Sequence, residues 1–248
     1  MRDLVFFAAD VHLGLSVRDP REREDRFVHF LRDIPRERTS ALYLLGDIWD
    51  FWYEYRDVVP KEGVRVVSEL LQLMDSGVEV FFFTGNHDIW CYSYFESLGM
   101  HRCAQPCDVM IGGRSFCLGH GDTLGGCAPS YSFMLGVFHN RMLQKLFSTL
   151  HPWLAFRIAL HWSRSSRRSH EPYRFRGEDE PLYHFALERS SVSKVDFFVF
   201  GHFHDLVDVT LPTGSRLLVL KDWMEGGQPC AVFDSSTGEL VNCSDYRP

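Results

Sequence analysis

The stretch VEVFFFTGNHDIW, residues 78–90, decides how the fold is interpreted. Its first six residues are β-branched or aromatic apart from one glutamate, a composition that predicts a buried strand. Asn86, His87 and Asp88 follow immediately after the glycine at its end. Side chains just beyond the carboxyl ends of parallel strands share one crevice, so these three residues are candidates for a functional site.

The surrounding sequence predicts a parallel sheet with helices on its faces. Short apolar runs at residues 5–9 and 41–45 predict two more strands, and apolar residues at helical spacing over 20–34 and 63–76 predict helices between them. This β-α-β-α-β order is typical of an α/β fold. Further strands are expected at residues 109–118 (a hairpin), 196–200, 216–220 and 230–233.

A mostly helical stretch, residues 125–194, interrupts the β-rich chain. Residues 130–161 have helical character, with Pro152 restarting a helix after a break, whereas the polar residues 163–169 are expected to form a loop. We interpret residues 1–248 as a single domain and residues 125–194 as a helical cap inserted within it.

Composition is that of an ordinary soluble globular protein, with 45% hydrophobic and 24% charged residues among 248. No apolar run approaches the ~18 residues of a membrane span, and the N-terminal run is too short for a signal peptide. Seven cysteines without a C-x-x-C motif make a disulfide framework unexpected. These observations favour a reducing compartment and a cytoplasmic location.

Charge is unevenly distributed along the chain. Residues 141–176 contain eight lysines and arginines and one glutamate, whereas the whole chain has a net charge of −7. A basic segment on an acidic body favours an anionic partner, although a solvated helical face would have the same composition.

Five apolar runs end in residues of the kind that bind metals. The run ends read ADVH (9–12), LGD (45–47), TGNHD (84–88), LGHGD (118–122) and FGHFH (200–204). In four of them a glycine directly precedes the first polar residue, which permits a tight turn that aims the next side chain into the crevice. A single histidine of this kind would be interpreted as a core or surface residue, but the whole set predicts a metal centre.

The ligand set suits two metal ions better than one. It contains two carboxylates, one carboxamide and four imidazoles, which favour Zn, Mn, Fe or Co over Ca or Mg alone. Two such ions about 3.5–4 Å apart, sharing one carboxylate, form a clamp for displacement at phosphorus. The candidate ligands are Asp10, His12, Asp47, Asn86, His120, His202 and His204.

In this order, D-x-H, G-D, G-N-H-D, G-H and G-H-x-H, the motifs resemble those of the calcineurin-like metallophosphoesterases. The resemblance runs from Asp10 to His204 and implies a four-layer α-β-β-α sandwich. It also implies that one metal is held by Asp10, His12, Asp47 and His204, and that the other is held by Asp47, Asn86, His120 and His202. A metal-bridging hydroxide would attack phosphorus, His87 would act on the phosphoryl group, and Asp88 would orient His87.

A narrower resemblance is to the UDP-2,3-diacylglucosamine diphosphatases of lipid A synthesis. It rests on D-V-H-L, L-Y-L-L-G-D-I-W-D-F-W, H-G-D-T-L and the helical insertion. It implies cleavage of the pyrophosphate to UMP and 2,3-diacylglucosamine 1-phosphate, with two Mn²⁺ ions, or Zn or Fe. The chain departs from that family at His87, where arginine is typical, and lacks its acidic residues at 125–128. The alternative is a general metal-dependent phosphodiesterase or phosphatase acting on another small molecule.

An acylated nucleotide sugar would need both polar and apolar contacts. Guanidinium and hydroxyl groups in the basic segment suit a diphosphate, and indoles near the bridging carboxylate could stack a uracil or line an acyl tunnel. The alternative interpretations, which involve packing alone, are that these indoles cover the sheet end and that the apolar cap helices pack on the body. The candidate substrate-binding residues are Asn86, His87, Asp122, Arg164, Ser166, Arg167, Arg168, Trp49 and Trp52.

Other function classes fit the sequence less well. A nuclease would explain the metals and the basic segment, but the remainder of the chain carries −14, which opposes a long polyanion, and no nucleic acid is expected. A metal-free binding scaffold would have lost ligands, and no ligand is missing here. No protein partner is implied, whereas an acylated substrate implies peripheral contact with the inner surface of the cytoplasmic membrane.

Overall fold

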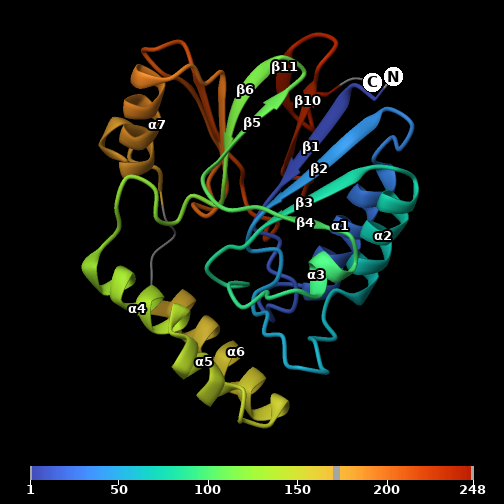
Figure 1. The fold of residues 1–248 in the computed structure, drawn as a ribbon, viewed down its shortest axis with the longest axis vertical. Coiled ribbons are helices and arrows are strands. Elements are labelled where there is room, and N and C mark those ends of the chain that lie inside the picture. Colours follow the sequence, from blue (N-terminus) through green and yellow to red (C-terminus); the bar gives the residue numbers. More distant parts are fainter. Residues whose placement is uncertain (1, 170–173, 247–248) are drawn as a thin grey trace.

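The structure is a computed structural model that describes residues 2–169 and 174–246; for residues 164–169 it describes the helical backbone alone. Two β-sheets face each other between layers of helices (Figure 1). The first sheet has the order β11-β10-β1-β2-β3-β4 and the second has the order β5-β6-β7-β9-β8. The predicted four-layer α/β sandwich is therefore confirmed.

The first sheet contains the predicted parallel unit β1 (Leu4–Ala8), β2 (Thr39–Leu45) and β3 (Glu79–Phe83). The short strand β4 (His101–Arg102) extends it on one side, and β10 (Cys230–Asp234) and β11 (Glu239–Asn242) pair antiparallel on the other. The second sheet consists of β5 (Cys107–Ile111), β6 (Arg114–Leu118), β7 (Phe197–Phe200), β8 (Val207–Thr210) and β9 (Arg216–Val219).

Helices cover the outer face of each sheet. The first sheet is covered by α1 (Pro20–Asp33), α2 (Val64–Asp75) and the short α3 (Tyr94–Ser97). Helix α1 begins after Asp19, whose carboxylate accepts hydrogen bonds from two first-turn amides, and Pro20 suits the first helical position. The second sheet is covered by α7 (Pro181–Val192), preceded by the 3₁₀ turn η1 (Gly177–Asp179).

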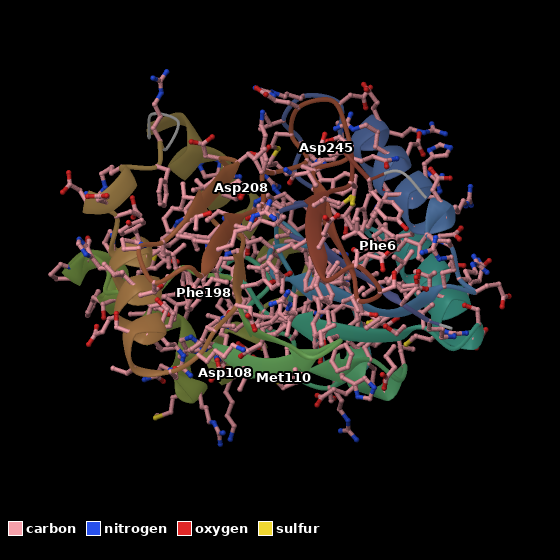
Figure 2. All side chains as sticks on the ribbon, turned by 90° about the horizontal axis from the view of Figure 1, so that it is seen from above. Phe6, Asp108, Met110, Phe198, Asp208 and Asp245 are labelled. Carbon is pink, nitrogen blue, oxygen red and sulfur yellow. A yellow bond between two sulfur atoms is a disulfide. The ribbon has the colours of Figure 1, made fainter. Side chains whose placement is uncertain are left out.

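Three apolar layers hold the sandwich together. Phe7 of β1 stacks on Phe116 of β6 between the sheets, with ring centroids 5.8 Å apart. On the outer faces, Phe6 lies on the α1 side and Phe198 on the α7 side (Figure 2). Because strand side chains alternate between faces, each sheet supplies one face to the central layer and one to its helices.

Three helices of the inserted segment, α4 (Pro129–His139), α5 (Arg141–Phe147) and α6 (Pro152–Ser169), form an arm at one end of the sandwich (Figure 1). The arm is attached by hydrogen bonds to loop aromatics: Tyr53 Oη donates to the Gln144 carbonyl at 2.7 Å, and Trp90 Nε1 donates to the Phe138 carbonyl at 2.8 Å. By contrast, α7, in the same segment, packs on the second sheet.

The expectation of a loop at residues 163–169 is wrong, because α6 continues to Ser169. No proline or glycine occurs between residues 153 and 169, so nothing in the backbone ends the helix there. The sequence analysis also missed β4, β8 and β11, which have two to four residues each and lack the continuous apolar run that marks the equally short β7 and β9.

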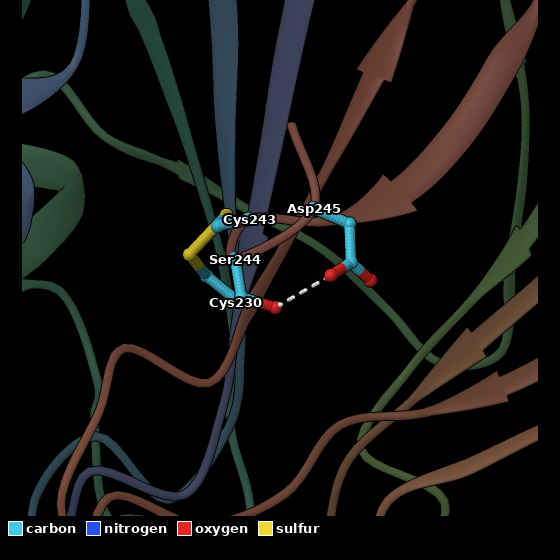
Figure 3. Close-up of a disulfide and its surroundings, with 4 residues drawn as sticks. All are labelled: Cys230, Cys243, Ser244 and Asp245. Carbon is cyan, nitrogen blue, oxygen red and sulfur yellow. Dashed lines mark hydrogen bonds between the residues drawn. A yellow bond between two sulfur atoms is a disulfide. The ribbon is translucent and has the colours of Figure 1, made fainter. Parts of the chain in front are cut away.

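Cys230 and Cys243 form a disulfide, with their Cα atoms 5.4 Å apart (Figure 3). The Cys243 amide donates to the Cys230 carbonyl at 2.8 Å, so the bond joins β10 to the end of β11. This single pair arises because antiparallel pairing brings together residues that are 13 apart in sequence, and the other five cysteines of the chain, all within the described residues, are free, so no disulfide framework forms. A disulfide is uncommon in a reducing compartment, so this pair does not support the expected location.

Candidate metal centre

The loops after five strands meet at the end of the sandwich nearest the arm (Figure 1). These loops follow β1, β2, β3, β6 and β7, and each one carries at least one candidate ligand within four residues of its strand. Parallel strands place their carboxyl ends at one edge, so residues almost 200 positions apart in sequence become neighbours there. The structure thereby brings together all seven candidate ligands.

One group of ligand atoms comes from Asp10, His12 and His204, and these atoms lie within 4.8 Å of one another. His12 Nε2 lies 3.8 Å from Asp10 Oδ1 and also 3.8 Å from Asp47 Oδ2. The His12 and His204 rings stack with centroids 5.0 Å apart. This geometry can accommodate one cation between two carboxylates and two imidazoles.

A second group forms on the other side of Asp47. His120 Nε2 lies 3.5 Å from Asp47 Oδ2 and 3.2 Å from Asn86 Oδ1. Asn86 Oδ1 in turn lies 3.0 Å from His202 Nδ1. Asp47 Oδ2 therefore faces both groups, as a carboxylate shared by two cations must.

Two buried carboxylate oxygens accept no hydrogen bond from any described residue: Asp10 Oδ1 and Asp47 Oδ2. Their partner oxygens are satisfied, because Asp10 Oδ2 accepts from the His202 amide and Asp47 Oδ1 accepts from the His87 amide, both at 2.8 Å. Leaving a buried carboxylate oxygen without a hydrogen bond is costly unless a cation compensates it. The donor set and these two oxygens fit divalent metal ions.

The backbone at the ligands is unusual. Five of the predicted ligands have φ values in the left-handed region: Asp10 (54°), His12 (50°), Asp47 (53°), His202 (75°) and His204 (56°). Such a conformation costs on the order of 1–3 kcal/mol for a residue with a side chain, and it persists where the surrounding structure requires it. Five instances on three different loops indicate that the loops are shaped by the direction in which these side chains must point.

Two glycines are needed for close approach and not for a positive φ. A Cβ on Gly85 would lie 2.1 Å from Asp47 Oδ1, and a Cβ on Gly201 would lie 2.4 Å from Asp10 Oδ2. Any side chain at these positions would displace a carboxylate of the site. The tight turns expected from the sequence therefore do not explain why glycine is needed at Gly85 and Gly201.

Burial and mutual charge dominate the ionisation of the cluster. Burial raises the pKa of Asp10 to about 6. Burial opposes the charge on His120, but the Asp47 and Asp10 carboxylates raise its pKa to about 10. Burial and the charge on His120 lower the pKa of His202 well below its usual value. Burial opposes ionisation of Asp47, yet the neighbouring imidazoles hold its pKa well below normal, so this carboxylate stays ionised and available as a ligand.

Two acidic residues that the sequence argument missed orient ligand imidazoles. Asp222 Oδ2 lies 2.8 Å from His204 Nδ1, and although burial opposes it, this bond lowers the pKa of Asp222. Asp50 Oδ1 lies 3.4 Å from His12 Nδ1. A carboxylate on one ring nitrogen fixes the tautomer and leaves the other nitrogen for a metal. Asp222 follows the end of β9 by three residues, and that strand-end position is the signal that could have identified it.

The predicted pairing of Asp88 with His87 is wrong. Asp88 is fully buried and accepts hydrogen bonds from the amides of Gly85, Asp47, Ile48 and Trp49, so it holds the two loops that carry Asp47 and Asn86. His87 Nδ1 instead lies 3.0 Å from the Asp50 carbonyl and 3.5 Å from Asp50 Oδ1.

Trp49 and Trp52 do not face the site, so the prediction that they contact substrate is wrong. Both are at most 1% exposed and pack with Phe82 and Phe95 in the layer beneath α2. Trp49 Nε1 donates to the Glu62 carbonyl at 3.0 Å. They cover the sheet end, as the packing interpretation of these indoles predicted.

The remaining predicted substrate contacts are only partly visible. Asp122 lies near the centre, and its Oδ2 accepts a hydrogen bond from Tyr131 Oη at 3.3 Å. His87 has 23% of its side chain exposed and can be reached from solvent. The side chains of four candidates lie outside the described residues: Arg164, Ser166, Arg167 and Arg168.

Proteins of known family have sequences similar to this chain. The sequence model of the family described as calcineurin-like phosphoesterase matches residues 4–206. A protein of Porphyromonas gingivalis named UDP-2,3-diacylglucosamine hydrolase is 36% identical over 100% of both chains. A protein of the same name from Stenotrophomonas maltophilia is 29% identical over 91% of this chain and 93% of its own length.

Among solved structures, a dimetal phosphatase from Danio rerio superposes with a TM-score of 0.52 at 18% identity. The superposition covers 94% of this chain and 92% of that protein. At this level of identity the likeness concerns the fold alone.

Proposed function

The chain belongs to the calcineurin-like phosphoesterase family and is a metal-dependent phosphoester hydrolase, and on this premise we propose its substrate. The proposed reaction is cleavage of the pyrophosphate of UDP-2,3-diacylglucosamine to UMP and 2,3-diacylglucosamine 1-phosphate. The observation that carries hydrolysis is the two buried carboxylate oxygens without a hydrogen-bond donor among the described residues, Asp10 Oδ1 and Asp47 Oδ2, within the imidazole cluster. The observation that supports this substrate is the full-length similarity to a protein of that name.

The proposed metal ligands are those expected from the motifs. Asp10, His12 and His204 would hold one ion, Asn86, His120 and His202 would hold the other, and Asp47 would bridge them. Two bound divalent ions polarise phosphoryl oxygens and lower the pKa of water for attack at phosphorus. Mn²⁺ is the ion we propose, and the ligand set also accepts Zn or Fe.

His87 is the proposed proton donor and charge stabiliser. Its Nδ1 points at the Asp50 carbonyl, which makes Nδ1 the protonated nitrogen of the neutral ring and leaves Nε2 for the substrate. When protonated, Nε2–H can donate to a phosphoryl oxygen or to the departing phosphate. An arginine at this position would supply charge and hydrogen bonds but could not release a proton.

The arm is the proposed binding element for the acyl chains and the membrane surface. Its helices expose many apolar side chains, and Arg141, Lys145 and Arg157 of the same helices would meet anionic lipid head groups. The exposed apolar side chains are Phe133, Val137, Met142, Leu143, Leu146, Trp153, Leu154, Ile158 and Trp162. Other apolar side chains of the arm pack on loop aromatics of the body, such as Phe156 on Phe51, whose ring centroids lie 5.1 Å apart. Some apolar residues of the arm therefore pack on the body, and the exposed ones are those we propose for the acyl chains.

Within residues 2–169 and 174–246, none of the helices combines the length and apolar character needed to cross a bilayer. The contact we propose is peripheral, on the inner face of the cytoplasmic membrane, in a single domain of residues 1–248 with residues 125–194 as its cap. The side chains of Arg164, Ser166, Arg167 and Arg168 would bind the diphosphate.

The test is incubation of the metal-loaded protein with UDP-2,3-diacylglucosamine and Mn²⁺, with release of UMP as the readout. Bis-(p-nitrophenyl) phosphate is run in parallel, and the Asp47→Ala protein serves as the inactive control. Release of UMP that depends on Asp47 supports the proposal. Hydrolysis of the diester without any UMP would favour the second candidate, a phosphodiesterase for another small molecule, which the imidazole at position 87 also suits.

A further inference from the structure

Ser163 lies on the inner side of α6 and is only 6% exposed. Its hydroxyl donates to Asp50 Oδ2 at 2.8 Å, and Asp50 is itself 2% exposed. A buried hydroxyl bonded to a carboxylate is among the stronger neutral-to-charged contacts, because little water competes for either group. The arm therefore reaches the body through a polar contact as well as through aromatic packing.

The carboxylate that Ser163 contacts also faces two histidines of the site. Asp50 Oδ1 lies 3.4 Å from His12 Nδ1 and 3.5 Å from His87 Nδ1, while the Asp50 carbonyl lies 3.0 Å from His87 Nδ1. The two imidazole rings meet edge to face with centroids 4.9 Å apart. A rotation of the Asp50 side chain would consequently change the environment of His87.

Packing alone does not require a hydroxyl at this position. The arm is already docked by Phe51 against Phe147 and Phe156, and by the hydrogen bond from Tyr53 to the Gln144 carbonyl. Alanine favours a helix more than serine does, so helix formation does not require the hydroxyl either. The feature that serine adds is a donor aimed at the Asp50 carboxylate.

We propose that Ser163 is a positioning residue that couples docking of the arm to the orientation of His87 through Asp50. The inference rests on the proposed function only in taking His87 to act on the phosphoryl group. With the arm docked, Asp50 is held by α6 and His87 is held by Asp50. If the arm left this position, Asp50 would lose this donor and its carboxylate could turn away from His87 Nδ1, which lies 3.5 Å from Oδ1. Turnover would then be tied to the docked state.

The experiment compares Ser163→Ala and Ser163→Thr, alone and in a His87→Ala background, using bis-(p-nitrophenyl) phosphate and Mn²⁺. We expect Ser163→Ala to lower kcat roughly 10-fold, at the lower end for loss of a hydrogen bond to a charged group, with KM and metal content unchanged. Ser163→Thr keeps a hydroxyl and should restore most of the activity. Because Ser163 acts through His87, its replacement should change kcat less than twofold in the His87→Ala protein.

Thr149→Ala is the matched control in the arm, since this exposed hydroxyl donates only locally, to the Leu146 carbonyl at 2.7 Å. Thr149→Ala should leave kcat unchanged, both alone and in the His87→Ala background. Amide hydrogen exchange of residues 152–163 gives a readout that does not need activity, and it should be faster in Ser163→Ala than in Thr149→Ala.

Each other outcome is decisive. An equal loss of kcat from Ser163→Ala with and without His87 would overturn the coupling, as would an unchanged kcat on the diester. Diester hydrolysis without UMP release refutes the proposed substrate and leaves this test valid. If the wild-type protein hydrolyses neither compound, the proposed function fails, and unchanged exchange in residues 152–163 then overturns the docking contact as well.

Discussion

Replacing Asp88 with asparagine should lower the stability of the protein and not merely its turnover. In the structure, Asp88 Oδ1 accepts from the amides of Gly85 at 2.7 Å and Asp47 at 3.3 Å. Asp88 Oδ2 accepts from the amides of Ile48 at 2.9 Å and Trp49 at 3.3 Å. An asparagine keeps one accepting oxygen and turns an NH₂ group toward the other two amides, which then have no acceptor.

The magnitude follows from the two orphaned donors. Each buried N–H without an acceptor costs about 1–3 kcal/mol, so the pair costs about 2–6 kcal/mol. A loss near 4 kcal/mol corresponds to a fall in Tm of roughly 8–16 °C for a chain of this size. Because at least one orphaned amide belongs to the loop that carries Asp47, whichever oxygen is replaced, the variant should also retain less metal after dialysis.

The assay is thermal unfolding in EDTA, which removes any contribution from bound metal, together with metal content by mass spectrometry. Asp57→Asn is the control, because that side chain is 86% exposed and its replacement should change stability by no more than about 0.5 kcal/mol. If Asp88→Asn had the wild-type Tm and metal content but a lower kcat, Asp88 would act on His87 after all, and the assignment of His87 to Asp50 would be refuted.

Four other replacements test the remaining assignments. His87→Ala should keep both metals and slow turnover by roughly 10²–10⁴, and loss of metal in that variant would make His87 a ligand. Asp47→Ala should abolish activity and lower the content of both metals, whereas loss of one metal with activity retained would contradict a bridging carboxylate. Cys230→Ser should lower the unfolding free energy in urea by about 3 kcal/mol, because the bond to Cys243 closes a short loop; no difference from the wild-type protein would mean that the two thiols are unpaired. Arg167→Ala should weaken the apparent affinity for a diphosphate more than for an aryl phosphate, and an equal effect would place Arg167 away from the diphosphate.

The prediction of the fold, and of which polar side chains meet at the strand ends, succeeded where the signal is local. The run at residues 78–83 is apolar enough to be a strand by itself, and the glycine at position 85 and the polar residues that follow lie within a few residues of its end. The same holds for Asp10 after β1 and His202 after β7. Because a strand end and its loop are contiguous, the residues that reach the common crevice can be recognised without knowing how the strands are ordered.

Prediction failed for contacts between side chains that are distant in sequence. Asp88 is adjacent to His87 in sequence, yet it bonds to amides about 40 positions away, while Asp50 takes the place expected of it. Trp49 follows Asp47 by two residues but points into the core beneath α2, since the chain turns between them.

The amino-acid sequence alone therefore determined which chemical groups this protein assembles, in what order, and at which ends of which strands. Only the tertiary structure decided which acid supports which imidazole, which aromatic side chains are buried, and how Ser163 of the arm reaches Asp50. The physical reason is range: strand formation depends on neighbouring residues, whereas a hydrogen bond forms only within about 3 Å and in one direction. Those distances and directions are set by packing two sheets and an arm together, and the order of residues along the chain does not encode them locally.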